Sequence, residues 1–518
     1  MDKNLQTVMH YHETTKHHQH RYARSLGYMD WATQPNPFRE YKGTSKIQLP
    51  LALDHDTPPY HLLSTPSVPT APVCKESISQ FLQFSLAIAA WKSAGGNSWA
   101  VRCNASSGNL HPTESYLILP PVISEKNLLT HYAPKDHKLE ILTEFESNFF
   151  DQLPQESFIL ALSSISWREV WKYGERAFRY VQLDVGHAWQ SVVTSAAILG
   201  WSVEKLDNVT DQQMAKILGL DQDERFFETE LPDMFLLVTP NETTRELDLT
   251  ALADDLPLKY DGVANKLSPT MQEWEIIPTI EQATQTPPLK QEHVTKLSHL
   301  KTPTRESKEV VLQRRSIHVM DKELSLISKE QFFTIIKSVT SSLDGNVCAV
   351  HPVLMVHRVK ELKQGLYILV RNEADKELLR SSMKEQFLWE ATELENLYFL
   401  QEGDFTIAAK DISCSQDIAS DGAFTLGMLT RFSQELQTYG AHRYKELYWE
   451  CGIIGQQLYL EATSLGLSGT GIGCFLDDLF HNLLGLRDNK FQTLYHFTVG
   501  KGFVDSRIMS LPAYEERR

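Results

Sequence analysis

Residues 183–200 read LDVGHAWQSVVTSAAILG, and residues 449–466 read WECGIIGQQLYLEATSLG. Each stretch is apolar over most of a helical circumference and ends in Leu-Gly. A helix that is apolar on most sides is buried, and glycine suits the left-handed residue that ends a helix. The pattern predicts two buried helices that stop at Gly200 and Gly466.

Working outward from these helices, the second half of the chain matches the first without gaps at an offset of 266 residues. The matched pairs are Tyr173-Gly174 with Tyr439-Gly440, Gly186 with Gly452, Gln190 with Gln456, Ala196 with Ala462, Ser202 with Ser468, Asp211 with Asp477, and Leu218-Gly219-Leu220 with Leu484-Gly485-Leu486. Chance matching of common residues is the alternative, but the long ungapped run argues against it. The sequence therefore predicts a duplicated fold. Small residues at 186, 188, 452 and 455 suit an interface between the copies.

Upstream of the helices, His111-Pro112 matches His351-Pro352 at an offset of 240. The second copy would then carry 266 − 240 = 26 extra residues, which we expect within 372–437. At the same offset, residues 106–109 fall on 346–349, which read NVCA.

Strand-like runs alternate with helical patterns in each copy, which predicts an α+β fold. The clearest runs are 116–119, 158–162 and 234–238. The chain of 518 residues is too long for one ordinary core. Scattered Pro, Thr, Gln and Lys, as in Pro287-Pro288 and Thr302-Pro303-Thr304, mark a linker. We expect an N-terminal domain at 1–260, a linker at 261–308 and a C-terminal domain at 309–518.

The composition excludes several function classes. Hydrophobic residues make up 42% and charged residues 22% of the chain, and no apolar run is long enough to span a membrane. No secretory signal is recognised at the start, so a cytoplasmic location is expected. The net charge of −16 would repel a phosphate backbone, so nucleic acid is not expected as a partner.

The cysteines and the N-terminal histidines are the candidate metal ligands of this sequence. The six cysteines are far apart in the sequence and form no C-x-x-C motif, so we expect reduced, mostly buried thiols. They are Cys74, Cys103, Cys348, Cys414, Cys451 and Cys474. Histidines at 10, 12, 17, 18 and 20 could ligate a metal, but no spaced carboxylate or cysteine supports that hypothesis. The expected metal content is none.

The segment 102–112 reads RCNASSGNLHP and offers hydroxyls, an amide and a glycine just before a predicted strand. This turn resembles the Ser-Ser-x-Asn-x-(Gln/His)-Pro turn of the nitroreductase superfamily, which contacts FMN. The form here is most similar to the SagB-type dehydrogenase branch, as are residues 11–17 and Asp30-Trp31. An ordinary Asn/Gly turn is the alternative.

Three further motifs resemble the same family. Arg314-Arg315-Ser316 resembles its Arg-Arg-Ser opening, where guanidinium groups and a hydroxyl suit a phosphate and a ribityl chain. Gly469–Gly473 resembles the loop whose backbone N–H groups face the flavin ring, and glycine permits that close approach. Lys501 and Arg507 resemble the terminal basic residues that hold the phosphate.

The two copies have lost complementary parts of this site. In family homodimers one subunit gives the Ser-Ser-Asn turn, and the other gives the arginines, the glycine loop and the basic tail. The first copy keeps only the turn, since it has 203–207 (VEKLD) in place of the glycine loop. The resemblance thus implies two tandem FMN-dependent nitroreductase-like domains that form an intramolecular pseudo-dimer with one FMN. The implied cofactor-binding residues are Arg102, Ser106, Ser107, Asn109, Arg314, Arg315, Ser316, Gly471, Ile472, Gly473, Lys501 and Arg507.

Two positions depart from the family pattern. His318 stands where many members have a second spaced Arg or Lys, and His111 replaces the commoner Gln. We expect these changes to affect phosphate affinity or flavin potential.

A Lys-Tyr pair provides the candidate catalytic residues. SagB-type azoline dehydrogenases carry such a pair for proton removal, and Trp171-Lys172-Tyr173-Gly174 resembles that segment. A lysine whose pKa is lowered by desolvation can act as a general base. A packing tyrosine beside a solvent-facing lysine is an equal alternative.

The resemblance implies an FMN-dependent oxidoreductase that passes a hydride through flavin N5. Two reactions stay open: reduction of nitro or quinone-like compounds with NAD(P)H, and oxidation of a substrate, such as a peptide heterocycle, with O₂ as acceptor. A flavin-binding pseudoenzyme without turnover is the rival hypothesis. Whether two chains pair further is also open.

Overall fold

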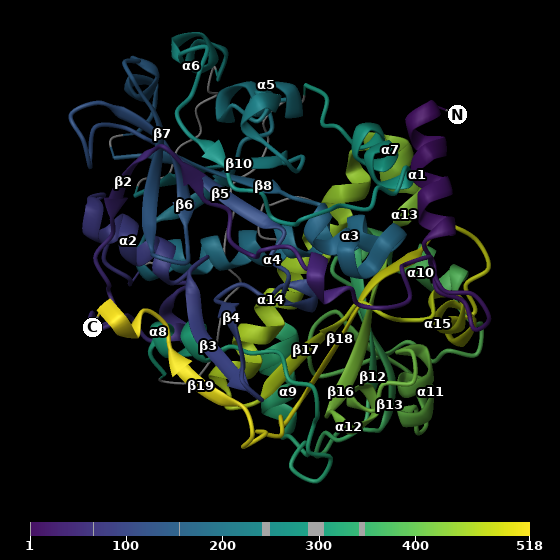
Figure 1. Cartoon of the computed structure of the whole chain (residues 1–518). Coiled ribbons are helices and arrows are strands. Elements are labelled where there is room, and N and C mark those ends of the chain that lie inside the picture. Colours follow the sequence, from purple (N-terminus) through teal and green to yellow (C-terminus); the bar gives the residue numbers. More distant parts are fainter. Residues whose placement is uncertain are drawn as a thin grey trace.

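The computed structural model describes residues 2–65, 67–154, 156–240, 249–288, 305–340 and 348–517. Two seven-stranded antiparallel sheets lie on either side of a pair of long helices, α4 and α14 (Figure 1). Strands of the first sheet, in spatial order, are β2 (Ser45–Gln48), β7 (Lys138–Phe145), β6 (Asn127–Ala133), β5 (Thr113–Leu119), β8 (Phe158–Ser164), β10 (Leu231–Thr239) and β9 (Ser202–Lys205). Strands of the second are β14 (Glu390–Ala391), β15 (Leu397–Glu402), β13 (Gly365–Leu369), β12 (Val350–Val356), β16 (Phe424–Thr430), β18 (Gln492–Gly500) and β17 (Ser468–Ile472).

Two small sheets and the remaining helices complete the described part. The small sheets are β1 (Tyr41–Lys42) with β11 (Val263–Ala264), and β19 (Met509–Pro512) with β3 (Ile88–Ala94) and β4 (Asn97–Arg102). The helices are α1 (Lys3–Thr14), α2 (Lys75–Gln83), α3 (Trp167–Tyr173), α4 (Ala177–Ile198), α5 (Asp211–Leu218), α6 (Leu249–Asp255), α7 (Ile276–Ala283), α8 (Ser307–Gln313), α9 (Lys329–Lys337), α10 (Lys376–Ser382), α11 (Thr406–Ile412), α12 (Ile418–Asp421), α13 (Phe432–Tyr439), α14 (Arg443–Ser464) and α15 (Asp477–Leu484). Over the described ranges, no helix combines the length and the apolarity needed to cross a membrane.

Helices cover both faces of each large sheet, so its central strands are buried throughout. In β5, Leu117 and Leu119 pack toward α2 and α4, whereas Tyr116 and Ile118 pack toward α5 and α6. This is the alternation with period two that a strand imposes. The second sheet repeats the arrangement, with α9 and α14 on one face and α10, α11 and α15 on the other.

The two sheets confirm the predicted repeat in their strand order. β8 and β16 begin 266 residues apart, at 158 and 424, as do α4 and α14 at 177 and 443. The predicted strand runs at 116–119, 158–162 and 234–238 lie in β5, β8 and β10. The mixed α+β prediction is therefore confirmed at the level of the fold.

The offset of 240 upstream of the helices is wrong by three residues. Thr113 pairs with Ser164, and Val350 pairs with Thr430. Since Ser164 and Thr430 are 266 residues apart, the sheets align at 350 − 113 = 237. His111-Pro112 precedes its strand whereas 351–352 lie inside β12, so that sequence match is coincidental. The second half carries 266 − 237 = 29 extra residues, and α10, α11 and α12 lie among them.

Glycines determine how the central helices meet. The helices start at 177 and 443, earlier than predicted, and end with Gly200 (φ 68°) and Gly466 (φ 72°) in the left-handed region as predicted. They cross at Gly186 and Gly452, where a Cβ on either residue would come within 2.9 Å of the other's Cα and overlap a backbone carbonyl. Only glycine permits this approach.

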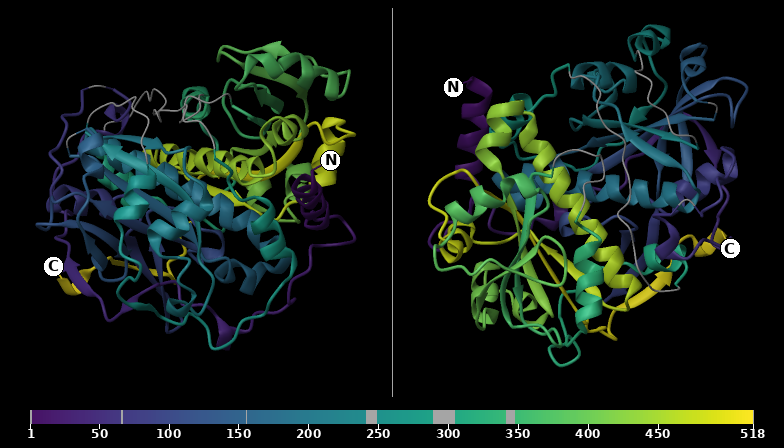
Figure 2. Two further views of the ribbon diagram at one scale, coloured as in Figure 1. Left: turned by 90° about the horizontal axis from the view of Figure 1, so that it is seen from above. Right: turned by 180° about the vertical axis from the view of Figure 1, so that it is seen from behind.

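Terminal segments extend from each half onto the other, as the two views of Figure 2 also show. Helix α1 reaches the second half, where the His12 Nε2 atom lies 3.0 Å from Gln492 Oε1. The C-terminal strand β19 pairs with β3 of the first half. Within the predicted linker, α7 buries Ile277 and Ile280, so this stretch is more ordered than its composition indicated. Thr302-Pro303-Thr304 and residues 346–347 lie outside the described residues.

The helix crossing yields the first prediction. Gly186→Ala should lower the free energy of unfolding by roughly 2–3 kcal/mol, because a methyl group there overlaps the carbonyl of Trp449. Urea denaturation followed by circular dichroism measures this change. Gln212→Ala, at an exposed position of α5, should stay within about 0.5 kcal/mol of the wild type. Equal stability of the two variants would contradict the tight crossing.

Candidate functional site

The hydroxyl-rich turn of the first half has an unusual, well-anchored backbone. Gly108, Asn109 and His111 have φ of 58°, 59° and 52°, in the left-handed region. The Ser106 hydroxyl oxygen accepts the His111 backbone N–H at 2.8 Å. The Asn109 amide donates to the Ala100 carbonyl at 2.8 Å, and its oxygen lies 3.1 Å from His111 Nε2. The turn is thereby held against β4.

Asp184 of α4 is the main partner of Ser107. It accepts from the Ser107 backbone N–H at 2.9 Å and from the Ser107 hydroxyl at 2.9 Å. Burial raises the pKa of Asp184 to about 7, although hydrogen bonds from Ser106 and Ser107 favour the charged form. The carboxyl under the turn therefore exchanges a proton near neutral pH.

Lys172 and Tyr173 lie directly against this turn. A Cβ on Gly108 would be 2.8 Å from the Tyr173 hydroxyl and 3.2 Å from Lys172 Nζ. Neither the ammonium nor the hydroxyl forms a hydrogen bond with any described residue. Burial raises the pKa of Tyr173 well above its usual value, so the hydroxyl keeps its proton. The structure thus brings the Lys-Tyr pair to the Ser-Ser-Gly-Asn turn.

A neighbouring tyrosine connects this pair to the second half. The rings of Tyr173 and Tyr180 are 4.3 Å apart. The Tyr180 hydroxyl donates to the Gly473 carbonyl at 3.1 Å, and Arg176 Nη2 donates to the same oxygen at 3.0 Å. Any Cβ on Gly473 would overlap the Tyr180 ring, so glycine is required at this junction.

The glycine segment is a strand rather than the loop that the sequence indicated. Residues 468–472 form β17 at the sheet edge and pair with β18. The Gly471 N–H donates to the Tyr459 hydroxyl at 2.8 Å. Ile472 is buried in the core and lies opposite His496 in the register. The side chain of Ile472 is therefore a core side chain.

The two arginines of the Arg-Arg-Ser motif have different surroundings. Arg314 is buried and donates to the carbonyls of Cys103 (2.9 Å) and Arg102 (2.7 Å), next to the Ser-Ser turn. Arg315 donates to the Leu312 carbonyl at 2.8 Å, and burial together with Arg314 lowers its pKa to about 10. The Ser316 hydroxyl lies 2.7 Å from the Tyr459 hydroxyl. The motif thus joins the second half to the turn of the first.

Three other predicted residues have hydrogen-bond or ion-pair partners of their own. The Arg102 side chain donates to the Pro37 carbonyl at 2.7 Å, inside the first half. Lys501 donates to the Gly466 carbonyl at 2.7 Å. Arg507 is exposed and forms an ion pair with Asp505 at 2.7 Å.

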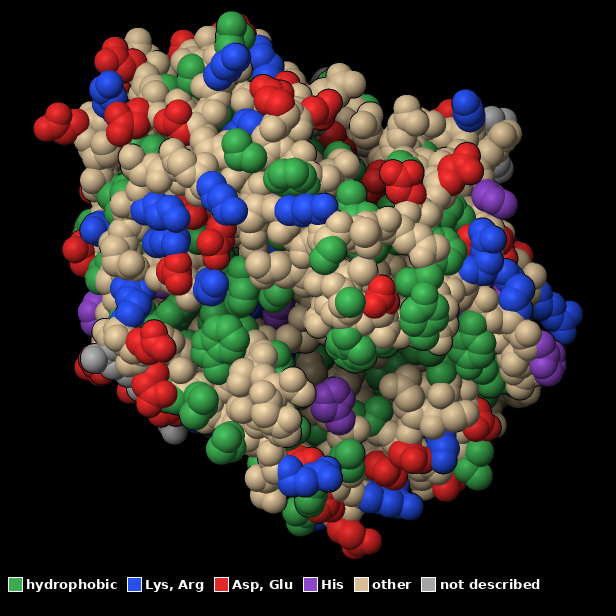
Figure 3. All heavy atoms as spheres, viewed as in Figure 1, with side chains coloured by type: hydrophobic (Ala, Val, Ile, Leu, Met, Phe, Trp, Pro, Cys, Tyr) green, Lys and Arg blue, Asp and Glu red, His purple; other side chains and the backbone are tan. Residues whose placement is uncertain are grey.

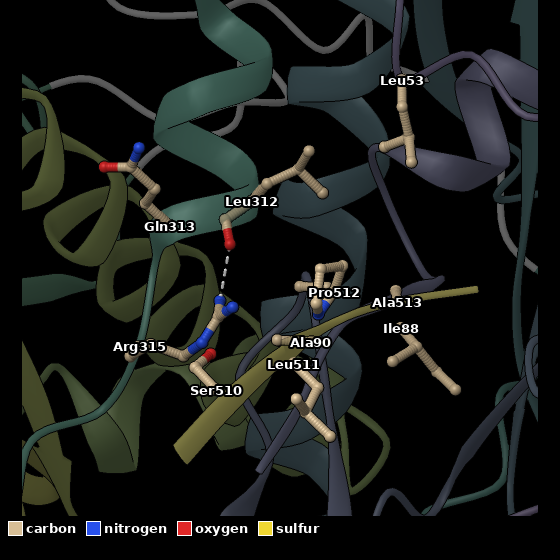
Figure 4. A pocket seen from close by; sticks show the side chains of 11 residues that line it. Leu53, Ile88, Ala90, Leu312, Gln313, Arg315, Ser510, Leu511, Pro512 and Ala513 are labelled. Atoms are coloured by element: carbon tan, nitrogen blue, oxygen red, sulfur yellow. Dashed lines mark hydrogen bonds between the residues drawn. The ribbon is translucent and has the colours of Figure 1, made fainter. Parts of the chain in front are cut away.

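Two hollows adjoin these elements. Figure 3 shows hydrophobic side chains around a hollow at the centre of the face seen in Figure 1, between β4 and β17. A second cavity of about 440 Å³ is lined mainly by β3, β19 and the end of α8, with Arg315 at its wall (Figure 4). Burial and Arg315 lower the pKa of Lys92 on β3, so two cations lie in this region.

Sequence reasoning missed several polar residues between the two halves. They are Arg176, Tyr180, Asp184, His187, Tyr459 and Tyr495. His187 lies 3.2 Å from Gln456 Oε1 and 3.2 Å from the Tyr495 hydroxyl. Polar residues inside a helix that is otherwise apolar were the available signal, because such residues need partners when buried.

Comparison with known proteins agrees with this fold. Residues 311–501 match the sequence model of the Nitroreductase family. A curated protein of Methanocaldococcus jannaschii, named "Putative nitroreductase", is 26% identical over 125 residues, which cover 23% of this chain and 63% of that relative. The crystal structure of a "putative nitroreductase" from Anabaena variabilis superposes with a TM-score of 0.71 at 20% identity, covering 96% of this chain and 99% of that one. The chain has a mixed α+β, nitroreductase-like fold.

The acid under the turn gives the second prediction. Asp184 favours its neutral form when folded, so its stabilising contribution is complete below about pH 4 and is lost as the pH rises toward 7. The stability of Asp184→Asn relative to the wild type should therefore rise by roughly 2 kcal/mol when the pH is raised from 5 to 8. Urea denaturation at both pH values measures the difference. A difference that does not change with pH would contradict the raised pKa.

Proposed function

We propose that this chain is an FMN-dependent oxidoreductase in which both halves form one composite site for one FMN. The observation that carries this proposal is the junction of Lys172, Tyr173 and Tyr180 with Gly473, beside the Ser-Ser-Gly-Asn turn. Residues of the two halves meet there, since the Tyr180 hydroxyl donates to the Gly473 carbonyl. The domain boundaries at 260 and 308, and an intramolecular pseudo-dimer of the two copies, belong to this proposal.

Several side-chain atoms near the junction fit a bound, polar, ring-shaped group. Lys172 Nζ and the Tyr173 hydroxyl have no hydrogen-bond partner within the described ranges, and the same holds for the buried atoms Asn104 Oδ1 and His111 Nδ1. A buried polar atom without a partner costs free energy, so a ligand that satisfies it gains affinity. FMN has both hydrogen-bonding ring edges and an apolar face.

We assign the residues to parts of the cofactor by their chemistry. Arg315 and Lys501 supply cations for the phosphate, and Ser316 supplies a hydroxyl for the ribityl chain. Ser106, Ser107 and Asn109 contact the ring from the first half, and Gly471 and Gly473 allow close approach from the second. Arg314 acts through the carbonyls of Arg102 and Cys103 rather than by direct contact.

A single site is favoured because the equivalent junction on the other side of the pair of central helices is closed by ion pairs. At an offset of 266, Tyr180 corresponds to Glu446 and Gly473 to Asp207. Lys205 contacts both of these carboxylates, and Arg443 Nη1 lies 3.1 Å from Glu446. Although burial opposes ionisation, Lys205 and Arg443 lower the pKa of Glu446 to about 2. At the second junction, charged side chains thus replace the tyrosine and the glycine of the first.

FMN, when bound, supplies hydride transfer at N5 of its ring. The chain's own residues provide proton transfer and exclude water: Tyr173 holds a proton at its hydroxyl, and Lys172 lies 5.3 Å from the centre of the Tyr173 ring. Burial and the neighbouring Glu169 raise the pKa of Tyr173, so its hydroxyl is a proton donor, and Lys172 is the candidate group for proton exchange beside it. This pair favours a substrate that exchanges a proton as well as a hydride, either a peptide heterocycle that is oxidised or a quinone or nitro compound that is reduced with NAD(P)H.

The stoichiometry of the cofactor is the third prediction. Purified full-length chain saturated with FMN should hold one FMN per chain, measured by absorbance after removal of free flavin. Arg315→Gln should weaken FMN binding about 10–100-fold, because a charge-assisted hydrogen bond is lost. Arg487→Gln removes an exposed arginine of the same half and should leave binding unchanged. Two FMN per chain, or none, would refute the composite site.

The Lys-Tyr pair gives the fourth prediction. Lys172→Gln and Tyr173→Phe should each lower kcat about 100-fold with NADPH and a quinone, because proton transfer is lost, while bound FMN stays constant. Tyr439→Phe is the matched control, because Tyr439 is the equivalent of Tyr173 and is 53% exposed. Wild-type kcat in both variants would exclude the proposed role. A wild-type protein that binds FMN but is not reoxidised by any acceptor would favour the flavin-binding module instead.

A further inference from the structure

Two cysteines that are distant in the sequence lie together beside the candidate site. Cys414 follows α11, and Cys474 follows β17 directly after Gly473. Gln416 Nε2 donates to the Ser413 carbonyl at 2.8 Å and to the Cys474 carbonyl at 3.3 Å, which holds the two cysteine segments side by side, and each thiol shifts the pKa of the other. The main chains are held in place as well, since the Leu476 N–H donates to the Ile412 carbonyl at 2.7 Å. Both cysteines are free and only partly buried, unlike Cys103, Cys348 and Cys451.

The surroundings of Cys474 stabilise a thiolate. His17 hydrogen-bonds to the Cys474 thiol, and the guanidinium of Arg176 is anchored one residue away on the Gly473 carbonyl at 3.0 Å. His17 Nδ1 accepts the Ala23 N–H at 3.1 Å, which directs Nε2 toward the sulfur. The neighbouring Cys414 thiol, the neutral His17 ring and the Arg176 guanidinium lower the pKa of Cys474 below its usual value. A thiolate is the reactive form of cysteine.

The partner thiol has the opposite character. Cys414 keeps its proton, because the hydrogen bond to Cys474 and burial both raise its pKa. Cys414 and Ser415 have φ of 54° and 61°, a left-handed pair that turns the chain back toward Cys474. Among the described residues, no group of three or more His, Cys, Asp or Glu side chains is arranged to hold a metal ion. The pair therefore suits thiol chemistry rather than metal binding.

We propose that Cys474 and Cys414 form a dithiol–disulfide redox site that takes low-molecular-weight disulfides as substrates. The Cys474 thiolate attacks one sulfur of the substrate disulfide, forms a mixed disulfide and releases one thiolate. Cys414 then gives its proton to that thiolate and attacks the Cys474 sulfur. The protein disulfide forms, and the second half of the substrate leaves as a thiolate. Two cysteines are oxidised, and one disulfide is reduced to two thiols.

The position of this site links it to the composite junction. Cys474 is covalently adjacent to Gly473, whose carbonyl accepts hydrogen bonds from Tyr180 and Arg176. A disulfide between Cys474 and Cys414 links the segment after β17 to the turn after α11. Helix α11 lies among the extra residues of the second half. The chemistry itself needs no flavin, so the redox site does not depend on the proposed function.

The test uses the reduced full-length chain and oxidised glutathione as the probe. After incubation, remaining thiols are alkylated and peptides are analysed by mass spectrometry. We expect a disulfide-linked peptide pair containing Cys414 and Cys474, formed at least tenfold faster than any modification of Cys74, which is also partly exposed. Dithiothreitol should reverse it. Equal modification of Cys74 and Cys474, or no cross-link, would overturn the proposal.

Two variants separate the roles of the cysteines. Cys414→Ser should accumulate a stable glutathione adduct on Cys474, because no second thiol resolves it. Cys474→Ser should leave Cys414 at least tenfold less reactive than Cys474 in the wild type. An adduct found preferentially on Cys414 would contradict the assignment. Flavin content is measured in the same samples, so loss of FMN binding with an intact cross-link would count against the proposed function alone.

Discussion

The close crossing of α4 and α14 at Gly186 and Gly452 is the constraint on which the rest of the structure depends. Because neither residue has a side chain, the two backbones meet directly, and each helix is packed against the sheet of its own half. The residues at and before the start of this crossing then lie between the Ser-Ser turn and the second half. Asp184 binds the Ser-Ser turn, Tyr180 reaches Gly473, and Arg176 lies beside it. A wider crossing would separate these groups from β17.

Segments near the two ends of the chain also hold the two halves together. His12 of α1 is buried against the second half, and the Tyr514 hydroxyl, beyond β19, donates to the Pro134 carbonyl of the first half at 2.6 Å. Between them, Asp477 of α15 faces Arg176 and Arg179 of α4, at 3.8 and 3.4 Å. These buried charges are stable because each has a partner, and removing one would leave the others unpaired. The two halves are therefore joined by apolar, polar and ionic contacts rather than by a single patch.

Sequence periodicity predicted the elements that depend on local chemistry. The central helices, their glycine caps and the buried strands follow from patterns that a single segment carries, and they were predicted correctly. What depends on pairing between distant segments was not predictable: the register offset of 237, the strand character of 468–472, and α7 within the linker. In the candidate site, the motifs identified the Ser-Ser turn and the Lys-Tyr pair, which the structure brings together. Arg314, by contrast, binds backbone carbonyls, because a buried guanidinium must satisfy its donors wherever the fold provides acceptors.

The asymmetry of the two halves is visible at one helical position. Asp184 of α4 corresponds to Glu450 of α14, and both carboxylates accept backbone N–H groups near the start of a central strand or its preceding turn. Arg371 forms an ion pair with Glu450, so the acid of the second half is neutralised by an arginine. No such cation forms a salt bridge with Asp184 among the described residues, and Lys172 instead favours the charged form of Glu169. A carboxyl group that is buried without a paired cation costs folding free energy when it is charged. This cost is borne in one half only, close to the junction where the Tyr180 ring packs on Gly473. Stability alone would favour a paired acid in both halves, so Asp184 marks the position where the first half departs from that arrangement.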